Sequence, residues 1–333
     1  MIGSESPDRR ALRSALIAST TAFVVITFHL PQPFLAVLAA VLLSPLPMDG
    51  VSGLAERLFA AAAGVAAGFL TAVLAPQAPW ISLPLFGFFC IFGYRAFYRW
   101  RGVATSLLFV MGVGGSFPAM WIIGPPGVET AIAHAMALWC AAASAAFWCM
   151  AIPFPVTQRA PSHEPHAVQA GCGAVTTILL SAVALPGEAV VMTIAALTGT
   201  LSLENAKEKA TEVALHLLGA FVGIVVSAGF LVLFVSNSND PAIFLIGFGF
   251  CFYGFERLAT GHGVIFWRRV AIVFAVCSTM GPAPDVGFIA SADRFMAILC
   301  GFGISAVFFL FAPNPQQSGQ ESESDIKEAN PHP

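Results

Sequence analysis

Few side chains in this sequence could do chemistry, and the clearest are polar residues set within long apolar runs. Arg294 follows Asp293 near the start of the last apolar run, and His134 lies near the start of an earlier one. A guanidinium grips a carboxylate through two parallel hydrogen bonds, and a histidine titrates or donates a hydrogen bond. We therefore take Arg294, Asp293 and His134 as candidates for contact with an anion. The alternative is that Arg294 lies at the membrane interface and pairs with Asp293, and that His134 is an ordinary interfacial histidine.

A second candidate group is Glu212 with His216. The two residues are four positions apart, so on a helix their side chains share one face. Such a pair can relay protons or control access to one end of a pathway. The alternative is that Glu212 is the solvated start of its helix. Charged pairs at other segment ends are typical of boundary positions, namely Glu56 with Arg57 and Glu256 with Arg257.

No catalytic, metal or cofactor signature is present in the sequence. It contains no H-E-x-x-H, no Walker A run and no G-x-S-x-G elbow. All 7 cysteines lie inside apolar runs without a C-x-x-C pair, which predicts neither a disulfide framework nor a zinc site. The net charge of −3 gives no basic surface for nucleic acid. We therefore expect no enzyme, no cofactor, no metal and no nucleic-acid partner.

The elements that carry these residues belong to a membrane. Hydrophobic residues make up 57% of the 333 residues and charged residues only 10%, whereas a soluble domain carries about 25% charged residues. A soluble surface needs that charge, and a lipid-facing surface does not. The composition predicts an all-α, polytopic bundle of membrane helices embedded in a lipid bilayer.

The hydropathy pattern predicts about twelve apolar segments, judged against the roughly 20 residues that a spanning helix needs. Segments 32–48 and 188–203 are marginal and could be re-entrant or kinked. The predicted segments are 13–30, 32–48, 57–75, 80–98, 103–123, 131–152, 167–185, 188–203, 211–235, 241–257, 264–281 and 293–312.

The two halves of the chain repeat one another at a nearly constant offset. The shift places Pro31 on Pro186 and, near the end of each half, His134 on Arg294. An even number of segments in each half implies two parallel six-segment repeats that share one orientation.

Small residues four positions apart form flat stripes on several predicted helices. Such stripes let two backbones approach closely, which replaces the hydrophobic drive that is absent in lipid. The alternative is simple alanine richness. We expect a helix-packing role for Gly64, Gly68, Gly219, Gly223 and Gly301.

The basic residues predict the orientation, because cytoplasmic loops are enriched in Lys and Arg. With a cytoplasmic N-terminus, every Lys and Arg except Arg294 falls on the inner side. Both termini are then cytoplasmic in a multi-pass protein of a bacterial inner membrane. The predicted parts are a cytoplasmic N-terminus (1–12), a first membrane repeat (13–155), a cytoplasmic linker (156–166), a second membrane repeat (167–315) and a disordered cytoplasmic tail (316–333).

Each half combines a charged start with a Gly-x-x-x-Gly helix and closes on a Pro-x-Pro. The charged starts are 56–58 and 205–209, which precede Gly64 with Gly68 and Gly219 with Gly223. This pattern resembles the fusaric acid resistance and aromatic acid exporter superfamily, in particular its short bacterial members without large soluble domains. The large cytoplasmic domains of many such exporters have no counterpart in this sequence, and no family ligand set carries over to particular residues.

The resemblance implies an inner-membrane permease that exports small organic, in particular aromatic, acids with coupling to the proton gradient. A periplasmic adaptor of the membrane-fusion type and a homo-oligomer are the partners that it suggests. The alternatives are a passive anion channel and a non-transporting scaffold of an envelope complex. A major-facilitator transporter also has twelve helices, but residues 48–57 match its loop motif poorly.

Overall fold

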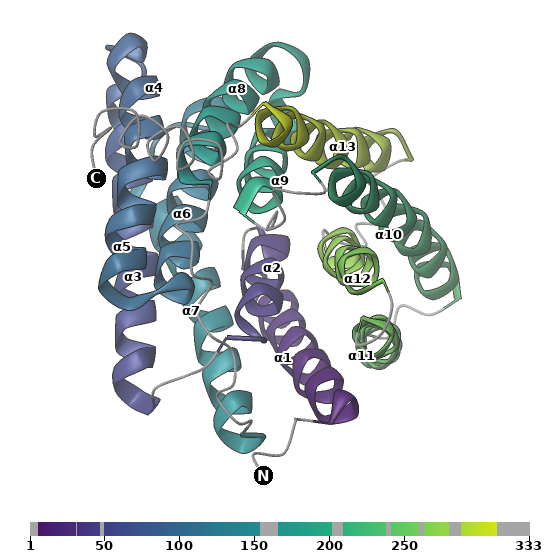
Figure 1. Ribbon diagram of the computed structural model, residues 1–333. Coiled ribbons are helices and arrows are strands. Elements are labelled where there is room, and N and C mark those ends of the chain that lie inside the picture. Colours follow the sequence, from purple (N-terminus) through teal and green to yellow (C-terminus); the bar gives the residue numbers. More distant parts are fainter. Residues whose placement is uncertain are drawn as a thin grey trace, which may run out of the picture.

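The structure, a computed structural model, describes residues 6–30, 32–46, 50–153, 166–201, 209–237, 241–259, 263–279 and 288–311. Within these ranges every regular element is a helix, so the predicted all-α class is confirmed (Figure 1). The predicted tail at 316–333 and most of the predicted linker at 156–166 lie outside the described residues.

The helices of the first half follow the predicted segments closely. Two of them continue through π-helical turns, at Phe89–Gly93 between α4 and α5 and at Ala119–Ile123 after α6. Prolines inside these helices, Pro84 and Pro118, remove backbone donors and favour such irregular turns. The helices are α1 (Pro7–Thr27), α2 (Pro33–Leu43), α3 (Gly50–Leu74), α4 (Pro79–Phe88), α5 (Tyr94–Arg101), α6 (Val103–Pro118) and α7 (Val128–Ala151).

The second half has a similar order of long and short helices. A single 3-10 turn, Pro186–Glu188, precedes its short second helix. The helices are α8 (Ala167–Ala184), α9 (Ala189–Leu201), α10 (Lys209–Asn237), α11 (Pro241–Leu258), α12 (Val264–Thr279) and α13 (Phe288–Leu310).

The first helix begins earlier than its hydropathy suggests. The side chain of Ser6 accepts a hydrogen bond from the backbone N–H of Arg9 at 3.4 Å, and Pro7 occupies the first turn. Both features favour a helix start. The helix therefore includes the arginines that the sequence places in a separate N-terminal segment ending at residue 12.

The described residues contain 8 helices that are long and apolar enough to cross a membrane, which makes this a multi-pass membrane protein. The continuous helices Pro79–Arg101 and Val103–Ile123 are among them. The prediction of about twelve spans also counts α2, α9, α11 and α12, which are not among the eight.

The short helices α2 and α9 lie at the centre of the bundle (Figure 1). Every residue of α9 from Ala189 to Thr200 is buried, and so are nearly all residues of α2. At 1.5 Å per residue the two helices are about 17 and 20 Å long, shorter than a hydrocarbon core of about 30 Å. Both helices are therefore enclosed by protein and are shorter than a full membrane span.

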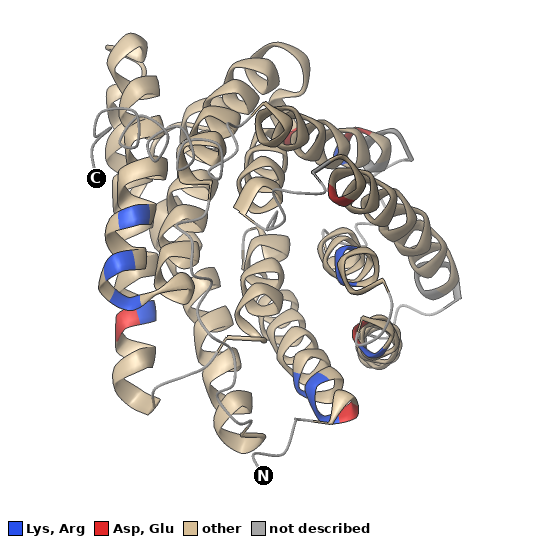
Figure 2. Cartoon of the chain, in the orientation of Figure 1, with Lys and Arg blue, Asp and Glu red and all other residues tan. Residues whose placement is uncertain are grey.

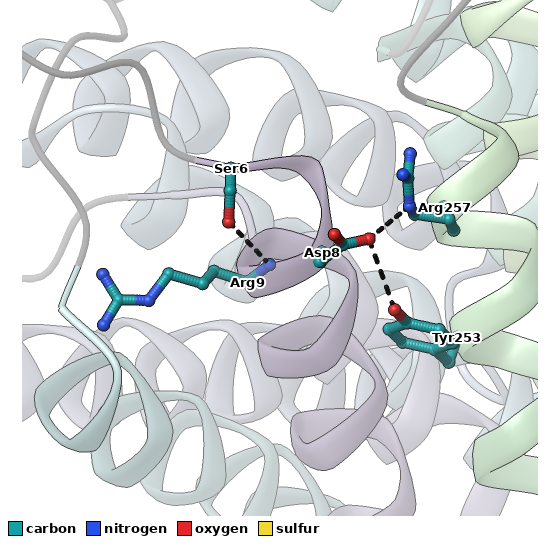
Figure 3. Close-up of polar contacts among 5 residues, drawn as sticks. All are labelled: Ser6, Asp8, Arg9, Tyr253 and Arg257. Carbon is teal, nitrogen blue, oxygen red and sulfur yellow. Dashed lines mark hydrogen bonds and ion pairs between the residues drawn. The ribbon is translucent and has the colours of Figure 1, made fainter.

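The long helices pack around this centre in two groups. α3 packs along α6 and α7, and α10 packs along α12 and α13. Contacts also join the halves, since α2 touches α12, α9 touches α6, α8 touches α4 and α1 touches α11. At the last of these contacts Asp8 forms an ion pair with Arg257 and accepts a hydrogen bond from the hydroxyl of Tyr253 at 3.4 Å (Figure 3).

Candidate functional site

Charged side chains occupy few helical turns of this bundle (Figure 2). One group of them is buried between helices of the second half, where α9 ends and α10 and α12 begin. Arg269 of α12 is 2% exposed, and Glu212 of α10 is 4% exposed. A buried charge is costly unless it is paired and hydrogen-bonded, so both side chains need partners inside the bundle.

His216 lies between the two charges. The Nε atom of Arg269 donates a hydrogen bond to Nδ1 of His216 at 2.9 Å. On the other side of the ring, Nε2 of His216 lies 3.8 Å from Oε1 of Glu212, which is an ionic contact longer than a hydrogen bond. The sequence predicts the Glu212–His216 pair on one helix face, and the structure adds Arg269 from a second helix.

An aromatic ring from a third helix completes the group. Cζ of Arg269 stands 4.5 Å from the centre of the Phe302 ring of α13, within the range of a cation–π contact. A cavity of about 10 Å³ adjoins it, lined by Arg269, His216, Phe302 and, in addition, Gly199, Val213, Leu217, Ser305 and Ala306. We call Glu212, His216, Arg269 and Phe302 the arginine cluster.

Sequence reasoning missed Arg269 because it counted this residue, with every other Lys and Arg except Arg294, on the cytoplasmic side. The helix pattern does not single out Arg269, because every residue of α12 from Arg269 to Thr279 is buried, whichever face it lies on. The same spacings of three, four and seven residues join Arg268 to the buried residues Ala271, Ile272 and Ala275.

The central gap between the halves is apolar. A cavity of about 20 Å³ is lined by residues of α2, α9, α12 and α13, and every lining residue is hydrophobic. Phe302 lines this cavity as well as the one beside Arg269. The ring of Phe302 therefore stands between Arg269 and the middle of the bundle. The lining residues are Phe34, Leu38, Val191, Ile194, Ala195, Ile272, Val273, Val276, Ile298 and Phe302.

Arg294 lies at the opposite end of α13 from the arginine cluster. Its Nε is 3.2 Å from Oε1 of Glu188, which belongs to the turn before α9, and the two side chains are 27% and 15% exposed. Asp293 is exposed beside it. Glu188 is a partner that the sequence analysis did not name, because it is distant along the chain.

His134 is 1% exposed near the start of α7, and its Nδ1 donates to the carbonyl of Thr130 at 2.8 Å. It borders a cavity of about 600 Å³, together with Gln32, Ala119, Ile123, Gly124, Pro125, Pro126, Gly127, Val128, Glu129 and Thr130. The predicted candidates thus fall into separate places. His216 and Glu212 belong to the arginine cluster, Arg294 pairs near α9, and His134 lies under a surface cavity of the first half.

The five glycines stand at close helix contacts. A Cβ atom on Gly64 would lie 2.1 Å from the Phe109 carbonyl oxygen, and one on Gly301 would lie 2.5 Å from that of Met192. The corresponding distance from Gly219 to the Phe266 oxygen is 2.8 Å. A Cβ atom on Gly68 or Gly223 would lie 3.0 Å from a carbonyl oxygen of the partner helix. A larger residue at any of these positions has to separate two helices.

Among the described residues, no group of three or more His, Cys, Asp or Glu side chains is arranged to hold a metal ion. Comparisons with protein-family models, with curated proteins and with solved structures found no match.

Proposed function

We propose that this protein is a membrane permease for small organic anions, and that Arg269 binds the carboxylate of the anion. The observation that carries the proposal is a guanidinium only 2% exposed within a membrane helix bundle. Such a charge is expensive at membrane depth, and ionisable residues kept there usually serve a pathway for ions or substrates. Arginine suits a carboxylate because its planar fork offers two parallel donors.

Phe302 supports an aromatic substrate. Its ring covers one face of Arg269 and also borders the central apolar gap. An aromatic acid carries a carboxylate on a flat apolar ring, so the guanidinium matches its charged end and Phe302 its ring. Benzoate is the simplest molecule of this class. Export of aromatic acids is also what the resemblance to the exporter superfamily implies.

We further infer that the two halves are parallel repeats related by duplication. The support is a shared pattern of contacts, in which α3 lies along α6 as α10 lies along α12. Across the halves, α2 meets α12 as α9 meets α6. In such an arrangement α2 and α9 are equivalent, and the substrate path runs between them.

The central gap favours a gated permease over an open channel. Its entirely hydrophobic lining and its volume of about 20 Å³ leave no continuous wet route. A passive anion channel remains the rival, and the proposed direction is export from the cytoplasm across an inner membrane. Cytoplasmic termini follow from the distribution of Lys and Arg. A periplasmic adaptor and a homo-oligomer belong to the same proposal.

The test is transport of benzoate by the purified protein in liposomes. Arg269→Gln should lower the initial rate per folded protein at least about tenfold, and Arg269→Lys should retain part of it, because an ammonium offers a charge without the fork. Arg99→Gln, which removes an exposed arginine of α5, is the matched control. An unchanged rate in Arg269→Gln overturns the proposal. Benzoate accumulation against its gradient, abolished by an uncoupler, excludes the channel.

A further inference from the structure

The cavity of about 600 Å³ in the first half lies at the start of α7 and is walled by the loop before this helix. That loop is stiff, because Pro125 and Pro126 have fixed φ angles, and both prolines line the cavity. Gln32 at the start of α2 and Ala119 in the π-helical turn after α6 line it as well. The volume falls in the range of small-molecule sites, about 300–1,000 Å³.

The first turn of α7 presents backbone donors to this cavity. The first hydrogen bond of the helix runs from the N–H of Ala131 to the carbonyl of Gly127 at 3.1 Å. The N–H groups of Val128, Glu129 and Thr130 therefore have no acceptor in the helix. No side chain caps them, and none of them donates a hydrogen bond within the described part of the chain. All three residues line the cavity, and such N–H groups at the positive end of a helix favour a carboxylate.

A buried acceptor lies one turn further along α7. Nδ1 of His134 is 2.8 Å from the carbonyl oxygen of Thr130, and because a carbonyl oxygen only accepts, Nδ1 carries the hydrogen. The side chain is 1% exposed and makes no ion pair with a described residue. A charged ring would be costly in that position, so the imidazole is neutral and Nε2 holds a lone pair. Among the described residues Nε2 has no hydrogen-bond partner.

The edge of the ring that carries Nε2 is turned away from the backbone of α7. Cδ2, the atom next to Nε2, lies 3.8 Å from the place that a Cβ atom on Gly115 of α6 would take. Ala119, four residues after Gly115, borders the same cavity as His134. A buried acceptor without a partner is unfavourable, so Nε2 needs a donor from an occupant of the cavity. Glu129 adds a second acceptor, since its exposed carboxylate also lines the cavity.

We propose that this cavity binds a zwitterion that carries a carboxylate and an ammonium group on one carbon atom, as a free α-amino acid does. The carboxylate accepts from the N–H groups of the first turn of α7, and the ammonium donates to Nε2 of His134 and to Glu129. Thr130 and His134 are about 6 Å apart along the helix axis. Two hydrogen bonds of about 3 Å each and the head of one amino acid span that distance.

The charges of the cavity favour this class of ligand over a simple ion. A plain anion would be repelled by Glu129, and a plain amine would leave the N–H groups of α7 without an acceptor. The side chain of the ligand is apolar, because Ala119, Ile123 and the two prolines supply much of the wall. The site goes beyond the proposed function, since none of its residues belongs to the arginine cluster.

The test is calorimetric titration of the purified full-length protein in lipid nanodiscs at about pH 8, where free imidazole is neutral. L-leucine is compared with 4-methylpentanoate, which lacks the ammonium, and with 3-methylbutylamine, which lacks the carboxylate. Leucine should bind at least about tenfold more tightly than either analogue, because each analogue loses charge-assisted hydrogen bonds. Equal binding of leucine and 4-methylpentanoate would make the cavity a plain anion site, and absence of leucine binding would leave it to water. Either result overturns the proposal.

Arg269→Gln separates this site from the anion site of the proposed function. It should bind leucine as the wild type does, and 4-methylpentanoate is titrated on it as well, so that binding at the arginine cluster is not counted. If leucine binding is lost in Arg269→Gln, leucine occupies the arginine cluster and the amino-acid site at α7 is wrong. A failure of benzoate transport leaves the leucine result untouched.

Val128→Pro removes one backbone donor and leaves the helix intact. Proline suits the first position of a helix, and Gly127, with a ψ of 137°, has the extended backbone that precedes a proline. Leucine and 4-methylpentanoate should each bind about tenfold more weakly, while 3-methylbutylamine should bind as before. Unchanged leucine affinity would show that the carboxylate does not lie at the start of α7.

His134→Leu and Glu129→Gln remove the two acceptors. Both should weaken leucine binding about tenfold, but 4-methylpentanoate should be unaffected by the first and bind more tightly to the second, because its repulsion is gone. His29→Asn, which changes an exposed histidine outside the cavity lining, should keep both affinities. Should His134→Leu not fold, the exposed Glu129→Gln decides alone. Equal changes for leucine and 4-methylpentanoate in Glu129→Gln would exclude an ammonium contact.

Discussion

The α3–α6 interface and the α10–α12 interface are built on the same contact. In each, two glycines four residues apart face backbone carbonyls of the partner helix, at Phe109 and Val113 in one and at Phe266 and Val270 in the other. They differ in the residue that lies three positions after the phenylalanine. In the first interface it is Gly112, where a Cβ would lie 2.7 Å from the backbone nitrogen of Val65. In the second it is Arg269, whose Cβ would lie 3.0 Å from a Cβ on Gly219.

This difference shows how one packing scheme serves two purposes. The first interface uses its close approach to bring backbones into contact, and it leaves no room for a functional group. The second has a slightly wider contact, and a guanidinium and an imidazole occupy the space between its helices. The buried guanidinium–imidazole pair therefore lies at one of these two interfaces and not at the other, even though both halves have a similar helix order.

The largest effect should follow from Gly64→Leu. A Cβ atom added at this position would lie 2.1 Å from the Phe109 oxygen, and a backbone atom cannot move aside as the end of a side chain can. We expect the yield of monodisperse protein to fall by about tenfold or more. Ala66→Leu on the exposed face of the same helix is the control and should fold normally. Equal yields would show that α3 and α6 are not in close contact.

Alanine substitutions should measure the difference between the two interfaces. Gly64→Ala should cost about 3 kcal/mol and Gly219→Ala about 1 kcal/mol, since overpacking is less severe where the contact is wider. The measurement is the unfolding free energy of each variant in mixed detergent micelles. A reversed order would mean that Arg269 makes the second interface the more rigid of the two.

Arg269→Met should separate function from stability. Replacing a buried charged group by an apolar one of similar size is often neutral or stabilising, so we expect the unfolding free energy to change by less than about 1 kcal/mol. Benzoate transport should be lost all the same. Unfolding together with loss of transport would indicate that the arginine cluster is a structural element of the α10–α12 interface.

The smallest effect should come from Arg294, outside both interfaces. Its partly exposed pair with Glu188 should contribute at most about 1 kcal/mol. Arg294→Gln and Glu188→Gln should therefore destabilise equally, with the double variant no worse than either, and transport per folded protein should stay within about twofold. A transport loss specific to Arg294→Gln would make Arg294 a substrate contact again.

Sequence patterns located the helices because apolar runs and turn formers are local signals. Where they failed, the information was not local. Hydropathy placed the first helix start at residue 13, although the cap at Ser6 begins it at Pro7. Glu188 and Arg269 acquire their roles from residues of other helices, Arg294 and His216, which no periodicity in one segment reveals. The pair Glu212–His216 was found because both residues lie on one helix face.

The contact between α1 and α11 has a consequence for biosynthesis. Asp8 of α1 pairs with Arg257 of α11, so α1 finds this partner only after all the helices between them in the sequence have been made. At about 5–20 residues per second this delay lasts some tens of seconds. During that time lipid or a membrane chaperone has to cover the face of α1 that later meets α11. Neither half can therefore complete its assembly alone, and the two halves have to mature in the same membrane at the same time.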